Sequence, residues 1–146
     1  MTTNLPHASG FRELLVYQKA RELARTIYGL TASFPKEEMY SLTDQIRRSS
    51  RSVGAQIAEA WAKRRYEKHF VSKLTDADGE QQETQHWIDT AMDCGYWTSE
   101  NATMLRQQCE EIGRLLGGMM AKAEMFCGNS TSAVRESSAE YFTSER

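Results

Sequence analysis

Apolar residues recur at steps of three and four along most of the chain, which is the spacing of an α-helix that buries one face. No segment shows the strict alternation of apolar and polar residues that marks a half-buried strand. The helical stripe runs through residues 11–33, continues from residue 37 onward, and returns at residues 67–95 and 99–127. Amphipathic segments of this length predict an all-α fold, an up-down antiparallel four-helix bundle with coiled-coil-like packing.

Helix-ending residues separate most of these segments. Pro35 ends the first one, because the residue before a proline is pushed out of the α region. Gly95 and Gly128 are expected to cap the ends of the third and fourth helices, and Ser99 is expected to cap the start of the fourth. Neither glycine nor proline lies between the second and third segments, so the sequence leaves the end of the second helix open.

A chain of 146 residues has the length of one domain with one core. The bundle is expected to span residues 11–127, preceded by a flexible N-terminus at residues 1–10. Residues 128–146 are rich in serine and charge and are expected to be a disordered tail. Removing that tail after Gly128 should therefore leave the melting temperature unchanged.

Neither the apolar runs nor the N-terminus points to a membrane or to secretion. The longest apolar runs are far shorter than the ~20 residues that cross a bilayer. The N-terminus lacks a basic start followed by an apolar segment, so no signal peptide is expected. Cys94, Cys109 and Cys127 are odd in number and form no Cys-x-x-Cys pair, which favours reduced thiols in a cytoplasmic protein.

Charge is distributed unevenly, although the formal net charge is only −2. Residues 44–73 contain eight basic and three acidic residues, whereas residues 74–94 contain six acidic residues and neither lysine nor arginine. On a helical projection, Ile46 and Ile57 share the buried face of the second helix, and its arginines lie away from that face. The sequence therefore predicts a basic second helix and an acidic third helix.

Two sets of charged residues are candidates for an interface. The basic set is expected to bind nucleic acid or a neighbouring subunit, with both alternatives open: Arg47, Arg48, Arg51, Lys63, Arg64, Arg65 and Lys68. The acidic set is expected to contact a neighbouring subunit: Glu59, Asp76, Glu80 and Glu83. Phosphate binding without sequence specificity needs little more than clustered guanidinium and ammonium groups. Ala55 and Ala58 are small outward residues beside the arginines, which would let phosphate or another protein approach closely.

Catalytic motifs are scarce. Glu83 and His86 have the Glu-x-x-His spacing of half a di-iron site, but such a site needs a second Glu-x-x-His and two more inward glutamates. No other histidine has a glutamate three residues before it. A metal-dependent bundle enzyme is a remote alternative, and no catalytic residue, metal or cofactor is expected. Gly117 and Gly118, within the fourth helix, are expected to permit close helix approach rather than phosphate binding.

Residues 45–61, QIRRSSRSVGAQIAEAW, resemble the signature of the four-helix-bundle proteins encoded in intervening sequences of 23S ribosomal RNA genes, the S23-like family. That family reads Gln-Ile-Arg-Arg-Ala-x-x-Ser-Ile-Pro-x-Asn-Ile-Ala-Glu-Gly. The matching positions are Gln45, Ile46, Arg47, Arg48, Ser52, Ile57, Ala58 and Glu59. The family's proline, asparagine and final glycine are replaced by Gly54, Gln56 and Ala60. The resemblance extends over about residues 11–126.

The resemblance implies a cytoplasmic bacterial protein that assembles into a five-membered ring, a homopentamer. A related branch of the family serves as the accessory protein of reverse transcriptases in diversity-generating retroelements and binds nucleic acid through a basic surface. The predicted function is therefore a non-catalytic, ring-forming assembly or adaptor protein that binds RNA or DNA without sequence specificity through its second helix. An accessory protein with a reverse transcriptase as its partner is the alternative.

Overall fold

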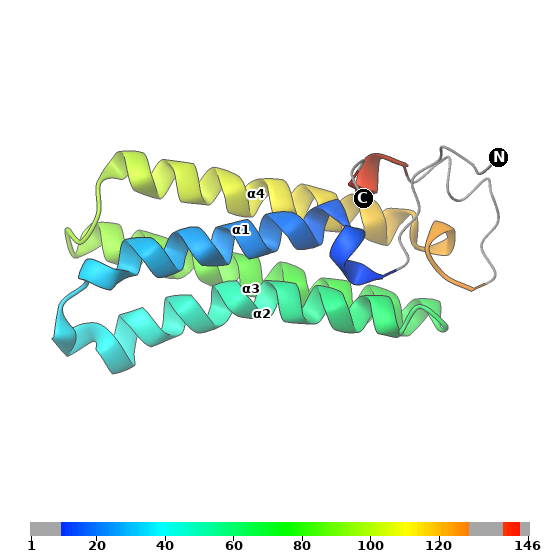
Figure 1. Ribbon diagram of the computed structural model, residues 1–146, viewed down its shortest axis with the longest axis horizontal. Coiled ribbons are helices and arrows are strands. Elements are labelled where there is room, and N and C mark those ends of the chain that lie inside the picture. The colour runs from blue at the N-terminus through cyan, green and yellow to red at the C-terminus, as the bar shows by residue number, and fades with distance from the viewer. Residues whose placement is uncertain (1–9, 129–138, 144–146) are drawn as a thin grey trace.

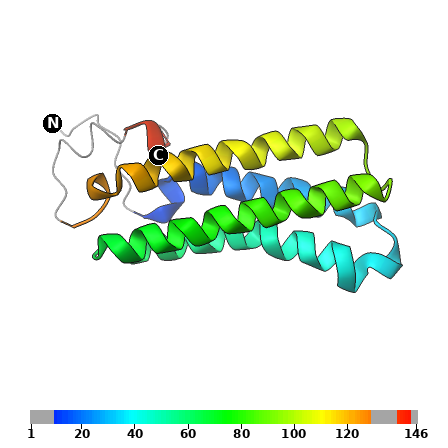
Figure 2. The ribbon, with the colours of Figure 1, turned by 180° about the vertical axis from the view of Figure 1, so that it is seen from behind.

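Four antiparallel helices form the bundle in the computed structural model, which describes residues 10–128 and 139–143. They are α1 (Leu15–Leu30), α2 (Asp44–Ala62), α3 (Glu67–Asp93) and α4 (Ser99–Ala121). Each helix contacts the next one along the chain, and α1 also contacts α4, so the bundle closes on itself (Figure 1; Figure 2 shows the reverse side). Among the described residues, the only β-type pairing is an isolated bridge between Leu14 and Phe142. The predicted all-α four-helix bundle is confirmed.

Short helical turns flank the four helices. The 3-10 turns are η1 (Phe11–Glu13), η2 (Thr31–Ser33), η3 (Lys36–Glu38), η5 (Ala123–Met125) and η6 (Ala139–Tyr141). One π-helical turn, η4 (Met39–Thr43), leads directly into α2. The second segment therefore starts near residue 37, as predicted, but it reaches α-helical geometry only at Asp44.

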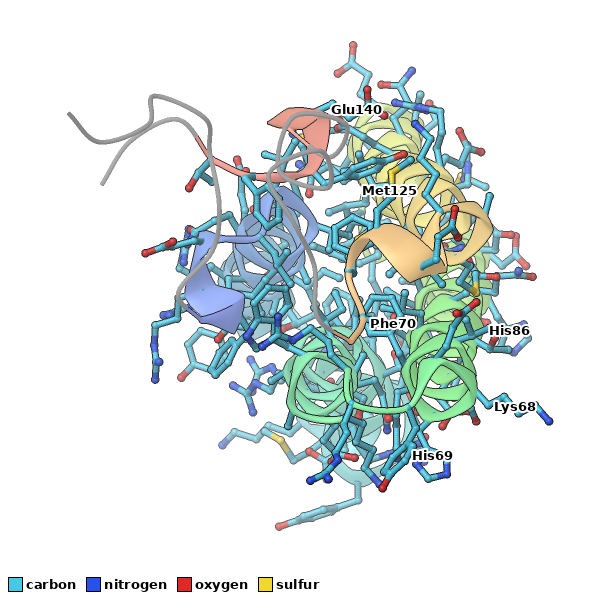
Figure 3. The ribbon with its side chains drawn as sticks, turned by 90° about the vertical axis from the view of Figure 1, so that its right-hand side faces the viewer. Lys68, His69, Phe70, His86, Met125 and Glu140 are labelled. Atoms are coloured by element: carbon cyan, nitrogen blue, oxygen red, sulfur yellow. The ribbon has the colours of Figure 1, made fainter. Side chains whose placement is uncertain are left out.

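One contiguous core runs along the inside of the bundle. Each helix contributes a buried stripe at steps of three and four residues, as the apolar pattern predicted. Ile46 and Ile57 of α2 are fully buried, which confirms the predicted phase of that helix. At the end of the bundle with the α2–α3 turn, Phe70 stacks on Phe126 with ring centroids 5.8 Å apart and points inward (Figure 3).

The turn between α2 and α3, which the sequence left open, occupies residues 63–66. Tyr66 precedes α3 with φ −123° and ψ 118°, an extended conformation that any residue can adopt. The break therefore requires neither glycine nor proline, which is why no such residue marks it.

The other helix ends follow the predicted residues only in part. Gly95 follows the end of α3 with a φ angle of 76°, the left-handed conformation expected of a glycine cap. Gly128 also has a left-handed φ angle, 71°, but the prediction that it caps the fourth helix is wrong, because α4 ends at Ala121 and the 3-10 turn η5 lies between them. At the start of α4 the cap lies one residue earlier than predicted. The hydroxyl of Thr98, rather than that of Ser99, accepts a hydrogen bond from the Asn101 amide at 3.0 Å.

Residues 139–143, the C-terminal segment, pack onto the bundle, and the prediction of a disordered tail is wrong for them. Tyr141 is only 5% exposed, and its ring lies edge-on to Phe126 with centroids 5.6 Å apart. The Thr143 amide donates to the Glu13 carbonyl at 2.9 Å. Tyr141 and Phe142 supply apolar surface that the serine-rich composition concealed. Residues 1–9, 129–138 and 144–146, and the predictions made for them, lie outside the described residues.

Gly118 makes room for the C-terminal segment. A Cβ atom at position 118 would meet the hydroxyl and ring of Tyr141, whereas a Cβ at Gly117 would meet open space. The two glycines were expected to permit close approach of helices. Gly118 instead accommodates a tyrosine from the C-terminal segment, and Gly117 is exposed.

A pair of hydrogen-bonded hydroxyls lies in the core where α2 meets α3. Ser49 and Thr84 are both fully buried, and their hydroxyl oxygens are 2.9 Å apart. The Thr84 hydroxyl also lies 2.8 Å from the Glu80 carbonyl, and the Ser49 hydroxyl lies 3.3 Å from the Ile46 carbonyl, so each hydroxyl has a carbonyl acceptor besides the other hydroxyl. This chain of bonds satisfies two polar groups that would otherwise cost about 1–3 kcal/mol each when buried without a partner.

Replacing both hydroxyls is expected to lower the free energy of unfolding by less than the sum of the losses in the two single variants. Ser49→Ala and Thr84→Val should each lower the free energy of unfolding by about 0.5–1.5 kcal/mol, because each removes one shared hydrogen bond. The double variant loses that same bond only once. Chemical denaturation of the four proteins measures this coupling, and strictly additive losses would show that the two hydroxyls do not act together.

Candidate nucleic-acid and subunit interfaces

The predicted basic set is divided among three places on the bundle. Arg47 lies over the ring of Tyr28, 4.4 Å from its centroid, and its Nε donates to the Thr31 hydroxyl at 2.8 Å. These contacts leave Arg47 half-buried and tie α2 to the C-terminal end of α1. Arg47 therefore packs two helices of its own chain together, which corrects the prediction that it projects from the bundle.

Arg48 lies on the seam between α2 and α3. One of its terminal nitrogens is 3.2 Å from Oε2 of Glu83. The same carboxylate oxygen accepts a hydrogen bond from the indole nitrogen of Trp87 at 3.0 Å. Arg48 and Glu83, which were candidates for opposite sides of a subunit interface, thus form an ion pair within one chain.

The remaining acidic candidates lie on the same seam. Lys73 Nζ is 2.8 Å from Glu59 and 3.8 Å from Asp76, and its hydrogen bond lowers the pKa of Glu59. Glu80 is half-buried, and one of its oxygens has no hydrogen-bond partner among the described residues. Burial, followed by the nearby charge of Glu83, raises the pKa of Glu80. The basic α2 and the acidic α3 therefore meet inside the chain.

Exposed cations gather at the end of the bundle that carries the α2–α3 turn. Lys63, Arg65 and Lys68 are exposed, and none of them forms an ion pair with an acidic side chain of the described residues. Tyr66 lies among them, 56% exposed, with its ring edge-on to that of His69 at 5.4 Å. Figure 3 looks at this end of the bundle, where Lys68 and His69 point away from it. We call Lys63, Arg65, Tyr66 and Lys68 the turn cluster.

Arg64 has a different environment from its basic neighbours. Its guanidinium lies 3.6 Å from the centroid of the Trp61 ring, and its Nε donates to the Trp61 carbonyl at 2.9 Å. Its own carbonyl accepts a hydrogen bond from the Gly128 amide at 3.3 Å. Burial lowers the pKa of the guanidinium. Arg64 therefore holds the turn in place and adds little to its exposed charge.

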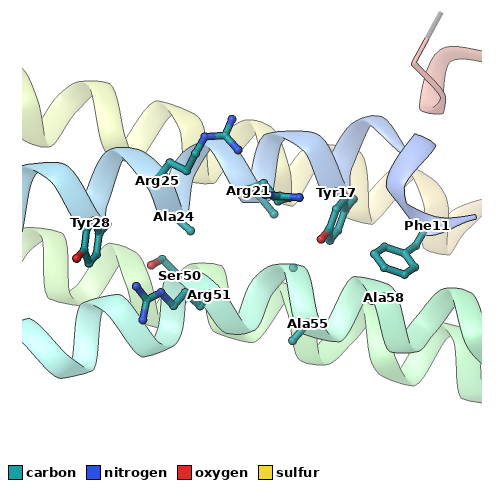
Figure 4. Close-up of a pocket in the computed structure, with 12 residues that line it drawn as sticks. Phe11, Tyr17, Arg21, Ala24, Arg25, Tyr28, Ser50, Arg51, Ala55 and Ala58 are labelled. Atoms are coloured by element: carbon teal, nitrogen blue, oxygen red, sulfur yellow. The ribbon is translucent and has the colours of Figure 1, made fainter. Parts of the chain in front are cut away.

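A groove of about 720 Å³ runs between α1 and α2 (Figure 4). Tyr28 lies at one end of it, and Phe11 and Tyr17 lie at the other, with their rings edge to face at 4.9 Å. Small side chains line the space between these aromatic ends: Ala20, Ala24, Gly54, Ala55 and Ala58. The predicted close-approach surface at Ala55 and Ala58 is thus one wall of an apolar groove.

Three arginines border the groove: Arg21 and Arg25 of α1, and Arg51 of α2. No acidic side chain of the described ranges forms an ion pair with any of them, and Arg51 lies 5.5 Å from the centroid of the Tyr28 ring. Arg51 was among the basic residues predicted from the sequence, whereas Arg21 and Arg25 were not. Their spacing of four residues puts them on one helix face, but only the packing of α1 beside α2 brings them to Arg51. We call these three residues the arginine rim.

The Glu-x-x-His spacing at Glu83 and His86 does not continue into a larger cluster. The Glu83 carboxylate binds Arg48 and Trp87, and the His86 ring lies edge-on to Trp87 at 4.6 Å. Within residues 10–128 and 139–143, no three His, Cys, Asp or Glu side chains are arranged to hold a metal ion. No helix in those ranges combines the length and apolarity needed to cross a membrane.

Comparisons with known proteins agree with the resemblance of residues 45–61. The model of the 23S rRNA-intervening sequence protein family matches residues 12–118. Among solved structures, the chain is similar to a protein of unknown function from the S23 ribosomal protein family of Bacteroides thetaiotaomicron, with 30% sequence identity and a TM-score of 0.67. The similarity covers 73% of this chain and 96% of that one. No curated protein shows significant similarity to the chain.

The family match begins just before α1 and ends near the end of α4, so it spans the whole bundle. It includes the α2 signature, the α2–α3 turn and both sides of the α1–α2 groove. The chain therefore belongs to the family of 23S rRNA-intervening sequence proteins.

Proposed function

We propose that this protein is a non-catalytic adaptor that assembles with copies of itself and binds nucleic acid, and that the turn cluster is its phosphate-binding surface. The observation that carries this proposal is the set of exposed cations at the α2–α3 turn. Lys63, Arg65 and Lys68 lie within six residues of one another and form no ion pair with the described part of the chain. Arg47, Arg48 and Arg64, by contrast, are engaged in contacts within the chain.

The chemistry of the turn cluster suits a single-stranded backbone. Ammonium and guanidinium groups bind phosphates of any sequence. The exposed ring of Tyr66 offers a face on which a base could stack, and such stacking is also tolerant of sequence. The net charge of −2 does not oppose this function, because screening limits electrostatic attraction to about 8–10 Å at physiological salt and the cluster is a local concentration of charge.

Self-assembly is the second part of the proposal, and its support is the α1–α2 groove. An apolar groove between aromatic ends, bordered by three arginines without ion pairs to the described residues, suits contact with another protein surface. The five-membered ring implied by the family resemblance remains a prediction. Service as the accessory protein of a reverse transcriptase would use the same two surfaces and remains the alternative.

Replacing the three cations of the turn cluster is expected to weaken binding and to reduce its dependence on salt. Lys63→Gln/Arg65→Gln/Lys68→Gln should lower the slope of log K against log salt by about 2 for a single-stranded RNA, since each lost phosphate contact contributes about 0.7. Fluorescence anisotropy between about 50 and 200 mM salt measures this slope. Tyr66→Ala should cost about 1–3 kcal/mol of binding free energy if a base stacks on the ring.

The matched control changes the net charge equally but at other places. Arg12→Gln/Lys36→Gln/Arg114→Gln removes three exposed cations that lie outside the turn cluster and form no ion pair with the described residues, and it is expected to leave the salt slope close to that of the wild type. Equal losses in the two triple variants would contradict a localised site. Failure of the wild type to bind RNA or DNA at low salt would refute the nucleic-acid function itself.

A further inference from the structure

We infer that the α1–α2 groove receives Met39 and Tyr40 of a second copy of this chain, so that copies join head to tail. This inference rests on the proposed self-assembly and identifies the two surfaces that make the contact. Met39 and Tyr40, the apolar knob, lie side by side in the π-helical turn before α2. They are 39% and 87% exposed, which makes Tyr40 the most exposed large apolar side chain of the described residues.

The turn that carries the apolar knob is fixed by contacts within the chain, and two acidic residues lie near the knob. The Tyr96 hydroxyl donates to the carboxylate of Glu38 at 2.7 Å, and Leu42 is buried in the core. The turn therefore has anchors on both sides of the knob. Glu37 and Asp44 flank it, and both are exposed and form no ion pair with the described residues.

The groove and the knob complement each other in two respects. The groove has an apolar lining that would be removed from water by Met39 and Tyr40, and burial of apolar surface is the main favourable term in association. The arginine rim borders the groove and has no carboxylate partner in the described chain, and the knob brings Glu37 and Asp44. Charge matching of this kind selects one register, because like charges placed together are costly.

A second surface with carboxylates, on α3 and α4, does not fit the groove equally well. A hollow on α3 and α4 is lined only by polar side chains and one glycine: Asp78, Gln81, Gln82, Gln85, Glu110 and Gly113. It could match the charge of the arginine rim, but it has no large apolar side chain to fill the space between the aromatic ends of the groove. The apolar knob combines two large apolar side chains with carboxylates close by.

The positions of the two surfaces favour repetition around a ring. Tyr28 lies in the last turn of α1, at the same end of the bundle as the α1–α2 connection that carries the knob (Figure 1). If two copies lie side by side with parallel bundle axes, the apolar knob of one copy lies at the same height as the Tyr28 end of the groove in the neighbouring copy. Since knob and groove are different patches, each copy has one of each, and such head-to-tail contacts close into a ring when the rotation allows it.

Light scattering on two variants and on their mixture tests this inference. Tyr40→Ser removes the knob, and Arg25→Glu/Arg51→Glu reverses the charge of the rim. Each variant alone is expected to lose the wild-type oligomer. An equimolar mixture is expected to form a dimer and nothing larger, because the intact knob of the rim variant can enter the intact groove of the knob variant, and the other two surfaces are disabled.

Matched controls separate these surfaces from the turn cluster. Tyr66→Ser removes another exposed tyrosine, and Lys63→Glu/Lys68→Glu reverses two exposed cations at the other end of the bundle. Both control variants are expected to keep the mass of the wild-type oligomer. Tyr40→Ser and Arg25→Glu/Arg51→Glu are expected to keep the RNA affinity of a single subunit. Circular dichroism establishes that every variant is folded.

Each of the remaining outcomes would contradict a stated part of the inference. A monomeric wild type would overturn both the self-assembly and the inferred contact. An oligomeric wild type whose mass survives Tyr40→Ser or the rim reversal would overturn the contact alone. A mixture that stays monomeric would exclude head-to-tail pairing. A rim variant that keeps its mass but loses RNA affinity would assign the rim to phosphate binding.

Discussion

Ile57→Ala is expected to lower the free energy of unfolding by about 2–5 kcal/mol, the range measured when a buried isoleucine is truncated to alanine. Ile57 has no exposed surface and lies at the centre of the buried stripe of α2. Truncation removes apolar contacts and leaves a cavity that close-packed neighbours fill only in part. Thermal and chemical denaturation of the two proteins measure the loss.

Gln56→Ala provides the control on the neighbouring residue of the same helix. Gln56 is half-buried, and its side-chain oxygen lies 3.4 Å from Lys73 Nζ, a long hydrogen bond near the surface. Its loss is expected to cost less than about 1 kcal/mol. A similar loss of stability in both variants, or none in Ile57→Ala, would contradict the assigned phase of α2.

Gly118→Ala is expected to destabilise the protein by about 1–3 kcal/mol, the usual effect of forcing an extra carbon into a packed site. The added Cβ would meet the hydroxyl and ring of Tyr141, so the tyrosine must leave its site or the helix must shift. Either response disturbs the contact of the C-terminal segment with Phe126 and with the backbone of Glu13. Denaturation curves measure the change.

The matched control is Gly117→Ala, where the added Cβ meets open space. This change is expected to stabilise α4 by up to about 1 kcal/mol, the difference in helix propensity between alanine and glycine. In a chain truncated after Gly128, Gly118→Ala should also become stabilising, because the tyrosine that it displaces is absent. A destabilising effect that persists in the truncated chain would show that Tyr141 is not the cause.

Truncation after Gly128 is itself now expected to lower the melting temperature, which reverses the expectation drawn from the sequence. The reason lies in residues 139–143, where Tyr141 is almost fully buried. Composition averaged over a serine-rich stretch does not register one aromatic side chain that fits against one glycine. The sequence contained Gly118 and Tyr141, but nothing in it related the two positions.

The sequence by itself determined the helices, the buried face of α2 and the family. These features are local: the apolar period sets the buried face of a helix, and the signature of residues 45–61 is read along one segment. The position of the α2–α3 turn could not be predicted from the sequence, because any residue can adopt the extended conformation of Tyr66.

Only the tertiary structure decided what each charged residue does. A projection of α2 placed Arg47, Arg48 and Arg51 outside the core, but it did not contain the neighbouring helices that they meet. The fold places Arg47 on Tyr28 and Arg48 on Glu83, and it leaves Arg51 beside the groove. It also adds Arg21 and Arg25 of α1 to that groove. Pairing of charges depends on which helix packs beside which, and the helical period, which describes one helix at a time, carries no information about that neighbour.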